Sequence, residues 1–175
     1  NRPPVRDANL EHAVADDLRN AMLQAHDIDL IRTGCHGDPF AVLGAHAEAV
    51  ARELAGLDLE LVRNPDWDEG IGTSIRCGVE AALAREPALD ALLLLLADQP
   101  GVSAALLDRI LAEHREGGGE LVACAYAGSL GVPALFSRDH FPDLLNLSGD
   151  QGAKRILARH RDVVAPVRFA RGATD

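Results

Sequence analysis

The chain reads Asp90-Ala91-Leu92-Leu93-Leu94-Leu95-Leu96-Ala97-Asp98-Gln99-Pro100 near its centre. Its seven consecutive apolar residues, 91–97, are too few for a membrane-spanning helix and suit a strand buried on both faces. Proline cannot continue a strand ladder, so we expect the chain to leave the sheet at Pro100. This predicts the Asp98 carboxylate at the carboxyl end of a central parallel strand, where open α/β sheets bind ligands. By position alone, Asp98 could equally well cap the helix expected near Ser103.

Length and composition favour a single folded domain over residues 1–175. Apolar residues make up 47% of the chain, which excludes a disordered protein, and aromatic residues make up only 3%. The formal net charge of −10 argues against a protein that binds the backbone of a nucleic acid. The three cysteines suggest no disulfide framework, and Cys35 beside His36 is a poor metal pair because adjacent residues rarely converge on one ion. Lacking an apolar N-terminal segment, the sequence predicts a cytoplasmic protein without membrane partners.

Strands and helices are expected to alternate along the chain after residue 39. The predicted strands are 40–44, 59–62, 91–97, 121–126, 132–136 and 163–169, and the predicted helices are 45–54, 74–85, 103–115, 141–145 and 154–160. This alternation predicts a three-layer α/β/α fold of Rossmann-like type with a mostly parallel sheet and right-handed crossovers. The segment around Pro133, following strand 121–126, allows an antiparallel element.

A glycine-punctuated loop runs from Asn64 to Ser74 and leads into the second helix. Thr73 or Ser74 is expected to cap that helix, whose free N–H groups and positive dipole end would form an anion site. An ordinary capped helix after a flexible loop explains the same pattern. Asn64, Trp67 and Ser74 are candidate binding side chains of this loop, although a lone tryptophan is more often a packing residue.

Four motifs occur along the chain in a familiar order and at familiar intervals. They are Asn64-x-x-Trp67-x-x-Gly70-x-x-x-Ser74-x-x-x-Gly78, Leu96-Ala97-Asp98-Gln99-Pro100, Gly131-x-Pro133-x-x-Phe136 and Gly149-Asp150-Gln151-Gly152-Ala153-Lys154. Together they resemble the MobA-like nucleotidyltransferases, most closely the molybdenum cofactor cytidylyltransferases. The resemblance covers roughly residues 40–170.

The resemblance implies the nucleotide-diphospho-sugar transferase fold and a reaction that transfers CMP from CTP to molybdopterin with release of pyrophosphate. It implies that Asp98 is catalytic and binds Mg²⁺, the expected cofactor, with Asp150 as a second metal contact. It further implies two sets of binding residues and a molybdenum hydroxylase or its maturation factor as partner. The nucleotide side comprises Asn64, Gly70, Gly72, Ser74, Gly78, Gln99 and Pro100, and the pterin side comprises Gly131, Pro133, Gly149, Asp150 and Lys154.

The sequence departs from the family at its start. Members open with a strand and a motif like Leu-Ala-Ala-Gly-x-Ser-x-Arg-Met-Gly-x-x-Lys, which residues 1–39 do not contain, and Lys154 is the only lysine. Because Leu10–Val14 resembles the helix that follows this motif, we expect the first strand and the glycine-rich loop to precede Asn1. Two alternatives therefore stay open: an inactive relative that binds nucleotide or pterin as a maturation accessory, and a sugar-phosphate nucleotidyltransferase.

Overall fold

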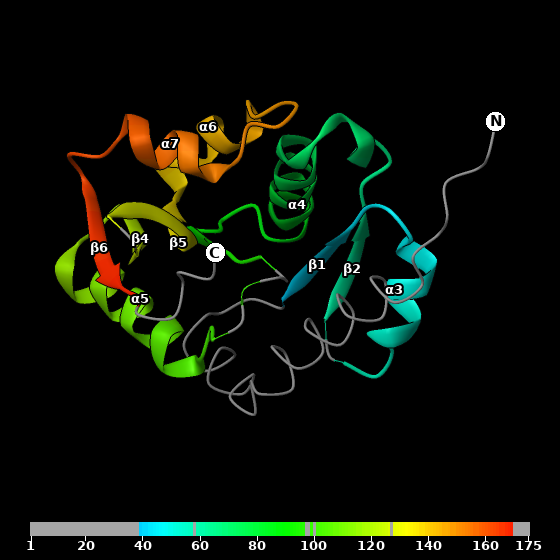
Figure 1. The fold of residues 1–175 in the computed structure, drawn as a ribbon, viewed down its shortest axis with the longest axis horizontal. Coiled ribbons are helices and arrows are strands. Elements are labelled where there is room, and N and C mark those ends of the chain that lie inside the picture. Colours follow the sequence, from blue (N-terminus) through cyan, green and yellow to red (C-terminus); the bar gives the residue numbers. More distant parts are fainter. Residues whose placement is uncertain (1–38, 58, 97–98, 100, 127, 170–175) are drawn as a thin grey trace.

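The computed structural model describes residues 39–57, 59–96, 99, 101–126 and 128–169 (Figure 1). Among these residues, no helix is long and apolar enough to cross a membrane. The elements are β1 Phe40–Leu43, α3 Ala47–Glu53, β2 Glu60–Arg63, the 3₁₀ helix η1 Trp67–Glu69, α4 Ile71–Arg85, β3 Ala91–Leu94, α5 Ala104–Gly117, β4 Leu121–Tyr126, β5 Ser129–Ser137, the 3₁₀ helix η2 Arg138–His140, α6 Phe141–Leu145, α7 Ala153–Arg159 and β6 Val164–Arg168.

Helices cover both faces of a four-stranded sheet, which confirms the predicted three-layer α/β/α architecture. In Figure 1, α6 and α7 lie above this sheet and α5 lies below it. Successive residues of β4 point to opposite layers, as the period of a strand requires. Leu121 packs with Val79, Leu144 and Ile156 from α4, α6 and α7. The next residue, Val122, packs on the other face with residues of α5. Apolar side chains on both faces of one strand are therefore what hold the layers together.

The strands pair as β1–β2 and as β3–β5–β4–β6. The β1–β2 and β4–β6 pairs are parallel, and β5 is the antiparallel element that the sequence allowed, lying between β3 and β4. The prediction of β3 as a central parallel strand needs correction, because in the described pairings it is an edge strand joined antiparallel to β5. An apolar run indicates burial on both faces, but it carries no information on the direction of the neighbouring strand.

The apolar run yields a shorter strand than predicted. β3 ends at Leu94, and Leu95 and Leu96 follow outside the strand with exposed fractions of 47% and 41%. Residue 97 lies outside the described residues. The other predicted boundaries are close to those observed, and strand 121–126 and helix 141–145 agree at both ends.

Strand β5 begins three residues before the predicted segment, because Ser129, Leu130 and Gly131 form a hairpin with the end of β4. The pairing changes register between Ala123 and Cys124, whose partners on β5 are Ala134 and Gly131. Pro133 lies in this irregularity, where its missing N–H costs no ladder hydrogen bond. Burial of the adjacent Cys124 side chain raises the pKa of its thiol to about 11, so this thiol stays protonated at neutral pH.

Candidate functional site

The segment that runs from the end of β2 into the first turn of α4, which we call the glycine turn (residues 64–72), is held in place by Asn64. This residue is only 4% exposed. Its Nδ2 donates to the hydroxyls of Thr73 at 2.9 Å and Ser74 at 3.0 Å, and its Oδ1 accepts from the Asp66 N–H at 3.0 Å. The side chain predicted to bind nucleotide thus makes three hydrogen bonds within the protein, and it fixes the turn against the first turn of α4.

The predicted cap of α4 is wrong in position. The helix begins at Ile71 with Gly70 at the N-cap, and no side chain in the described part of the protein makes a capping hydrogen bond to it. Thr73 lies inside the first turn, with its hydroxyl 2.8 Å from the Asp66 carbonyl and 2.9 Å from that of Gly70. The N–H of Gly72, a residue that the resemblance assigned to nucleotide binding, donates to the Gly149 carbonyl at 2.9 Å. Asn64 organises this helix start from outside the helix, and hydrophobic periodicity cannot detect such a contact.

The glycine turn packs directly against the loop between α6 and α7, residues 146–152, which we call the α6–α7 loop. Gly70 has φ +118°, and a Cβ there would lie 2.5 Å from the Gly149 carbonyl oxygen and 2.7 Å from Asp150 Oδ1. A Cβ on Gly72 would lie 2.8 Å from the Ser148 nitrogen. Both positions require glycine because backbone meets backbone. Two motifs that the resemblance assigned to different substrates are therefore in contact.

The surface at this contact is acidic and exposed. Asp66 is the N-cap of η1, and Asp68 and Glu69 belong to it. All three are exposed, as is Asp150 beside Gly70. The nearby Arg63 lies 2.6 Å from Glu48, and this exposed ion pair lowers the pKa of Glu48 and raises that of Arg63. A triphosphate bound here would need a cation to offset the carboxylates, since like charges close together repel.

Gln99, the middle residue of the Asp-Gln-Pro motif, is hydrogen-bonded to β5. Its Nε2 donates to the Val132 carbonyl at 3.0 Å, next to the buried Pro133. Its Oε1 is buried and has no hydrogen-bond partner among the described residues. Gly131 lies against the hydroxyl end of Tyr126, where a Cβ would clash. The structure thus brings Gln99 together with the Gly131–Pro133 segment.

Other predicted site residues take different places. Asp98 and Pro100 lie outside the described residues, as do Cys35 and His36. Gly78 faces Val42, where a Cβ would lie 3.0 Å from the valine Cγ2, so it lets α4 approach β1. Lys154 is exposed near the start of α7. Trp67 is 47% exposed and is therefore not buried in the core.

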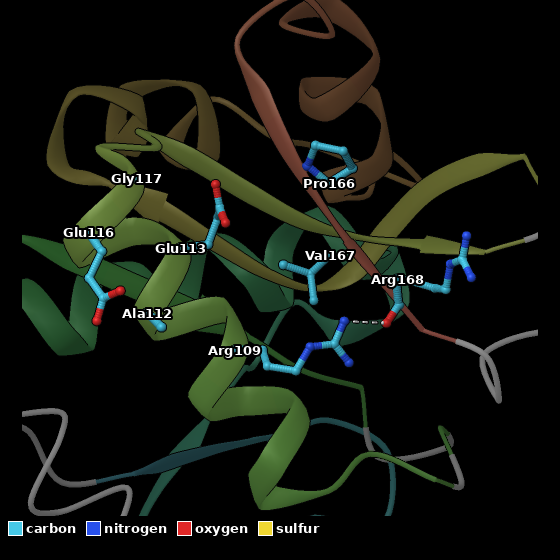
Figure 2. A pocket seen from close by; sticks show the side chains of 8 residues that line it. All are labelled: Arg109, Ala112, Glu113, Glu116, Gly117, Pro166, Val167 and Arg168. Atoms are coloured by element: carbon cyan, nitrogen blue, oxygen red, sulfur yellow. Dashed lines mark hydrogen bonds between the residues drawn. The ribbon is translucent and has the colours of Figure 1, made fainter.

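A surface hollow of about 330 Å³ lies elsewhere, between α5 and β6 (Figure 2). Arg109 of α5 donates from Nη2 to the Arg168 carbonyl across it at 3.0 Å. The hollow contains none of the predicted site residues. Its lining includes Arg109, Glu113, Glu116, Pro166, Val167 and Arg168.

One group of side chains in the described part of the chain lies close enough to hold a divalent metal ion: His140, Asp143 and His160. Sequence reasoning missed this group. The spacing of His140 and Asp143, three residues apart at a helix start, was the available signal, since it places both side chains on one helix face. His160 is distant in sequence and carried no signal of its own.

We expect Asn64→Ala to lower the free energy of unfolding by about 2–4 kcal/mol, because a buried side chain loses three hydrogen bonds at about 1 kcal/mol or slightly more each. Urea denaturation measures the change. Asn146→Ala is the matched control, since Asn146 is exposed and its Nδ2 makes one hydrogen bond, to the Pro142 carbonyl at 2.8 Å. The control should lose at most about 0.5 kcal/mol. Equal losses in the two variants would show that Asn64 does not organise the turn.

Known proteins resemble this chain in sequence and in structure. Nicotine blue oxidoreductase of Paenarthrobacter nicotinovorans is 35% identical over 134 residues, which cover 71% of this chain and 61% of that protein. The chain therefore spans about three fifths of this relative's length.

Solved structures share the fold over nearly the whole chain. Rv0371c of Mycobacterium tuberculosis H37Rv, crystallised in complex with manganese, matches with a TM-score of 0.66 and 29% identity over 96% of this chain and 79% of that one. A nucleotidyl transferase from a Methanothermobacter species matches with a TM-score of 0.65 and 25% identity, over 91% and 71% of the two chains. The model of the MobA-like NTP transferase domain matches residues 17–163, and the chain therefore belongs to this family.

Proposed function

We propose that the chain transfers CMP from CTP to molybdopterin. An oxygen of the pterin phosphate attacks the α-phosphorus of CTP, the bond from that phosphorus to the bridging oxygen breaks, and pyrophosphate leaves. Such a reaction needs the two substrates side by side more than it needs a protein nucleophile. A molybdenum hydroxylase or its maturation factor would be the partner that receives the product.

One observation carries the proposal, namely the contact between the glycine turn and the α6–α7 loop. The resemblance assigns Gly70 and Gly72 to the nucleotide and Gly149 to the pterin, and Gly72 donates to Gly149 at 2.9 Å. Substrates held by these two segments would lie next to each other. Because one fold hosts many reactions, this juxtaposition supports the proposal more strongly than the fold does.

The residues present fit a hard divalent cation such as Mg²⁺, which binds oxygen ligands. Asp150 supplies an exposed carboxylate beside Gly70, and the buried Oε1 of Gln99 has no partner among the described residues. Asp98, adjacent to Gln99 in sequence, is the proposed principal ligand. When bound, the ion would offset charge on the phosphates. Rv0371c was crystallised with manganese, which is consistent with a divalent ion in this family.

The chain's own residues would then bind and orient the substrates. Asn64 fixes the glycine turn, Gln99 fixes β5 through Val132, and the exposed Lys154 offers a cation to a phosphate at the start of α7. The fixed positions matter because donors already in place cost no reorganisation during the reaction.

Two measurements test the proposal on this chain. In the first, binding of CTP, GTP and ATP is compared by calorimetry with and without Mg²⁺, and we expect CTP to bind most tightly and only with the metal. In the second, pyrophosphate release from CTP is followed with molybdopterin or with a sugar 1-phosphate as acceptor. Release with the sugar phosphate alone would contradict the proposal and favour a sugar-phosphate nucleotidyltransferase. Binding of CTP without release under any condition would favour the inactive accessory.

A further inference from the structure

Three side chains from separate elements meet where α6 begins and α7 ends. His140 ends η2, Asp143 belongs to α6, and His160 is the C-cap of α7. Their ligand atoms lie within 4.8 Å of one another. The closest pair is His160 Nε2 and Asp143 Oδ2, 2.9 Å apart, and the two imidazole rings stack edge to face with centroids 4.9 Å apart.

His140 gives a second and independent indication of a ligand. The residue is 8% exposed, and its Nε2 is buried with no hydrogen-bond partner among the described residues. The nearest carboxylate oxygen in an ion pair with it is Glu120 Oε2 at 3.6 Å, too far for a hydrogen bond. A buried nitrogen without a partner is costly, so such an atom in a folded protein calls for an explanation.

We propose that His140, Asp143 and His160 bind a divalent transition-metal ion of the zinc type, with Glu120 as the fourth ligand. Two imidazole nitrogens and two carboxylates suit Zn²⁺ and similar ions, whereas Mg²⁺ prefers oxygen ligands alone. Ligands around a tetrahedral zinc ion lie about 3.3 Å apart when each is ~2.0–2.1 Å from the metal. The closest pair in the group, 2.9 Å apart, lies below this spacing, and none of its three ligand atoms is more than 4.8 Å from another, so rearrangement of the side chains would let them close around an ion.

The surroundings of the group also suit a metal. Arg159 Nη1 donates to Asp143 Oδ1 at 2.8 Å, which leaves Oδ2 directed toward His160. Such a supporting hydrogen bond is typical of carboxylates that bind metals. On metal binding, Nε2 of each histidine would carry the metal while its Nδ1 carries the proton, and the contact between His160 Nε2 and Asp143 Oδ2 would be replaced by a bond from each atom to the ion. Two carboxylates would balance the two charges of the ion.

The position of the group gives the ion a structural role. Asp143 and His160 are 17 residues apart and flank the α6–α7 loop, whereas Glu120 precedes β4 and His140 follows β5. An ion held by all four would fasten α6 and the end of α7, the two helices that this loop connects, to the sheet. It would thereby steady Gly149, the acceptor of the Gly72 hydrogen bond. This inference uses neither Asp98 nor CTP, so it stands apart from the proposed function.

The test uses the full chain after removal of metals with EDTA. Titration with Co²⁺ should show one equivalent bound, with the intense visible absorption of a four-coordinate ion, and Zn²⁺ should displace it. The unfolding temperature should rise with Zn²⁺ concentration, because a ligand that binds only the folded state stabilises it. X-ray absorption of the zinc form should show only nitrogen and oxygen ligands at ~2.0–2.1 Å, whereas a site at Cys35 would add sulfur at ~2.3 Å.

Variants locate the ion. His160→Gln and Asp143→Asn should each weaken Zn²⁺ binding by more than ~100-fold, the upper end of what loss of a supporting hydrogen bond costs. His46→Gln removes a histidine far away, at the N-cap of α3, and should bind as the parent does. Hydrogen exchange in the α6–α7 loop should slow when Zn²⁺ is added to the parent chain.

Three outcomes would overturn the inference. These are failure of the parent chain to bind Co²⁺ or Zn²⁺, a sulfur ligand in the absorption spectrum, and unchanged affinity in both ligand variants. Unaltered exchange in the α6–α7 loop would overturn the structural role of the ion. The absorption and exchange measurements need only the parent chain, so they decide the matter even if a variant does not fold.

Discussion

Replacing Gly70 by alanine should lower the free energy of unfolding by about 2–6 kcal/mol and displace the α6–α7 loop. Gly70 has φ +118° and ψ 174°, a conformation that is essentially restricted to glycine and costs other residues ~1–3 kcal/mol. The added Cβ would also lie 2.5 Å from the Gly149 carbonyl oxygen, and such overpacking costs ~1–3 kcal/mol more. Chemical denaturation measures the loss, and CTP affinity should fall with it if the proposed function is right.

Two matched variants separate these causes. Gly56→Ala introduces only the backbone strain, because Gly56 has φ +92° and no atom of the described residues lies within 4 Å of the position that a Cβ would take there. Gly72→Ala introduces only the close contact without backbone strain, because Gly72 is helical and its Cβ would lie 2.8 Å from the Ser148 nitrogen. We expect each to cost less than Gly70→Ala. If Gly70→Ala costs no more than Gly56→Ala, the close approach of the two loops does not occur in solution.

The contact at Gly70 also marks the limit of what the sequence could predict. The resemblance assigned glycines 70, 72 and 149 to the site, and the glycine-punctuated loops that hold them are visible in one dimension. That they touch depends on how α4 packs against α6, which is a tertiary contact with no local pattern. The resemblance supplied the two roles, and only the structure supplied their contact.

Strand positions were more predictable than strand partners. Apolar runs predicted β3 and β4, since burial on both faces leaves a continuous hydrophobic signal. The insertion of β5 between them depends on the hairpin at Ser129, where Gly128 with φ +75° allows the turn. The sequence allowed an antiparallel element around Pro133 but could not show that β5 would also pair with β3. Its placement makes β3 an edge strand of the four-stranded sheet.

Contacts between polar side chains that are distant in sequence set a second limit on what the sequence could predict. The resemblance assigned Asn64 to the nucleotide, and a sequence motif does not show which groups a side chain contacts. Its partners, Thr73 and Ser74, are nine and ten residues away in sequence. Their hydrogen bonds with Asn64 hold the first turn of α4 in place. The group of His140, Asp143 and His160 was missed for a related reason, because His160 reaches Asp143 only when α6 and α7 pack together.

Replacing Asp98 by asparagine should have the largest effect on activity. If Asp98 holds the ion that offsets the phosphate charge, its loss should lower pyrophosphate release from CTP by at least ~10²–10³-fold, as removal of one preorganised group does. Tight binding of CTP in the presence of Mg²⁺ should also be lost. Without Mg²⁺ the effect should reverse in sign, because one negative charge fewer then faces the triphosphate, and the variant should bind CTP at least as well as the parent.

The control comes from the same apolar run. Asp90 stands at its other end, is exposed, and precedes β3, so Asp90→Asn makes the same chemical change away from the proposed site. This variant should match the parent with and without Mg²⁺. Asp150→Asn should weaken the Mg²⁺ dependence less than Asp98→Asn does, since it is proposed as the second contact. If Asp98→Asn and Asp90→Asn behave alike, Asp98 binds no catalytic ion, and the residue at the end of the apolar run has only the capping role that its position also allows.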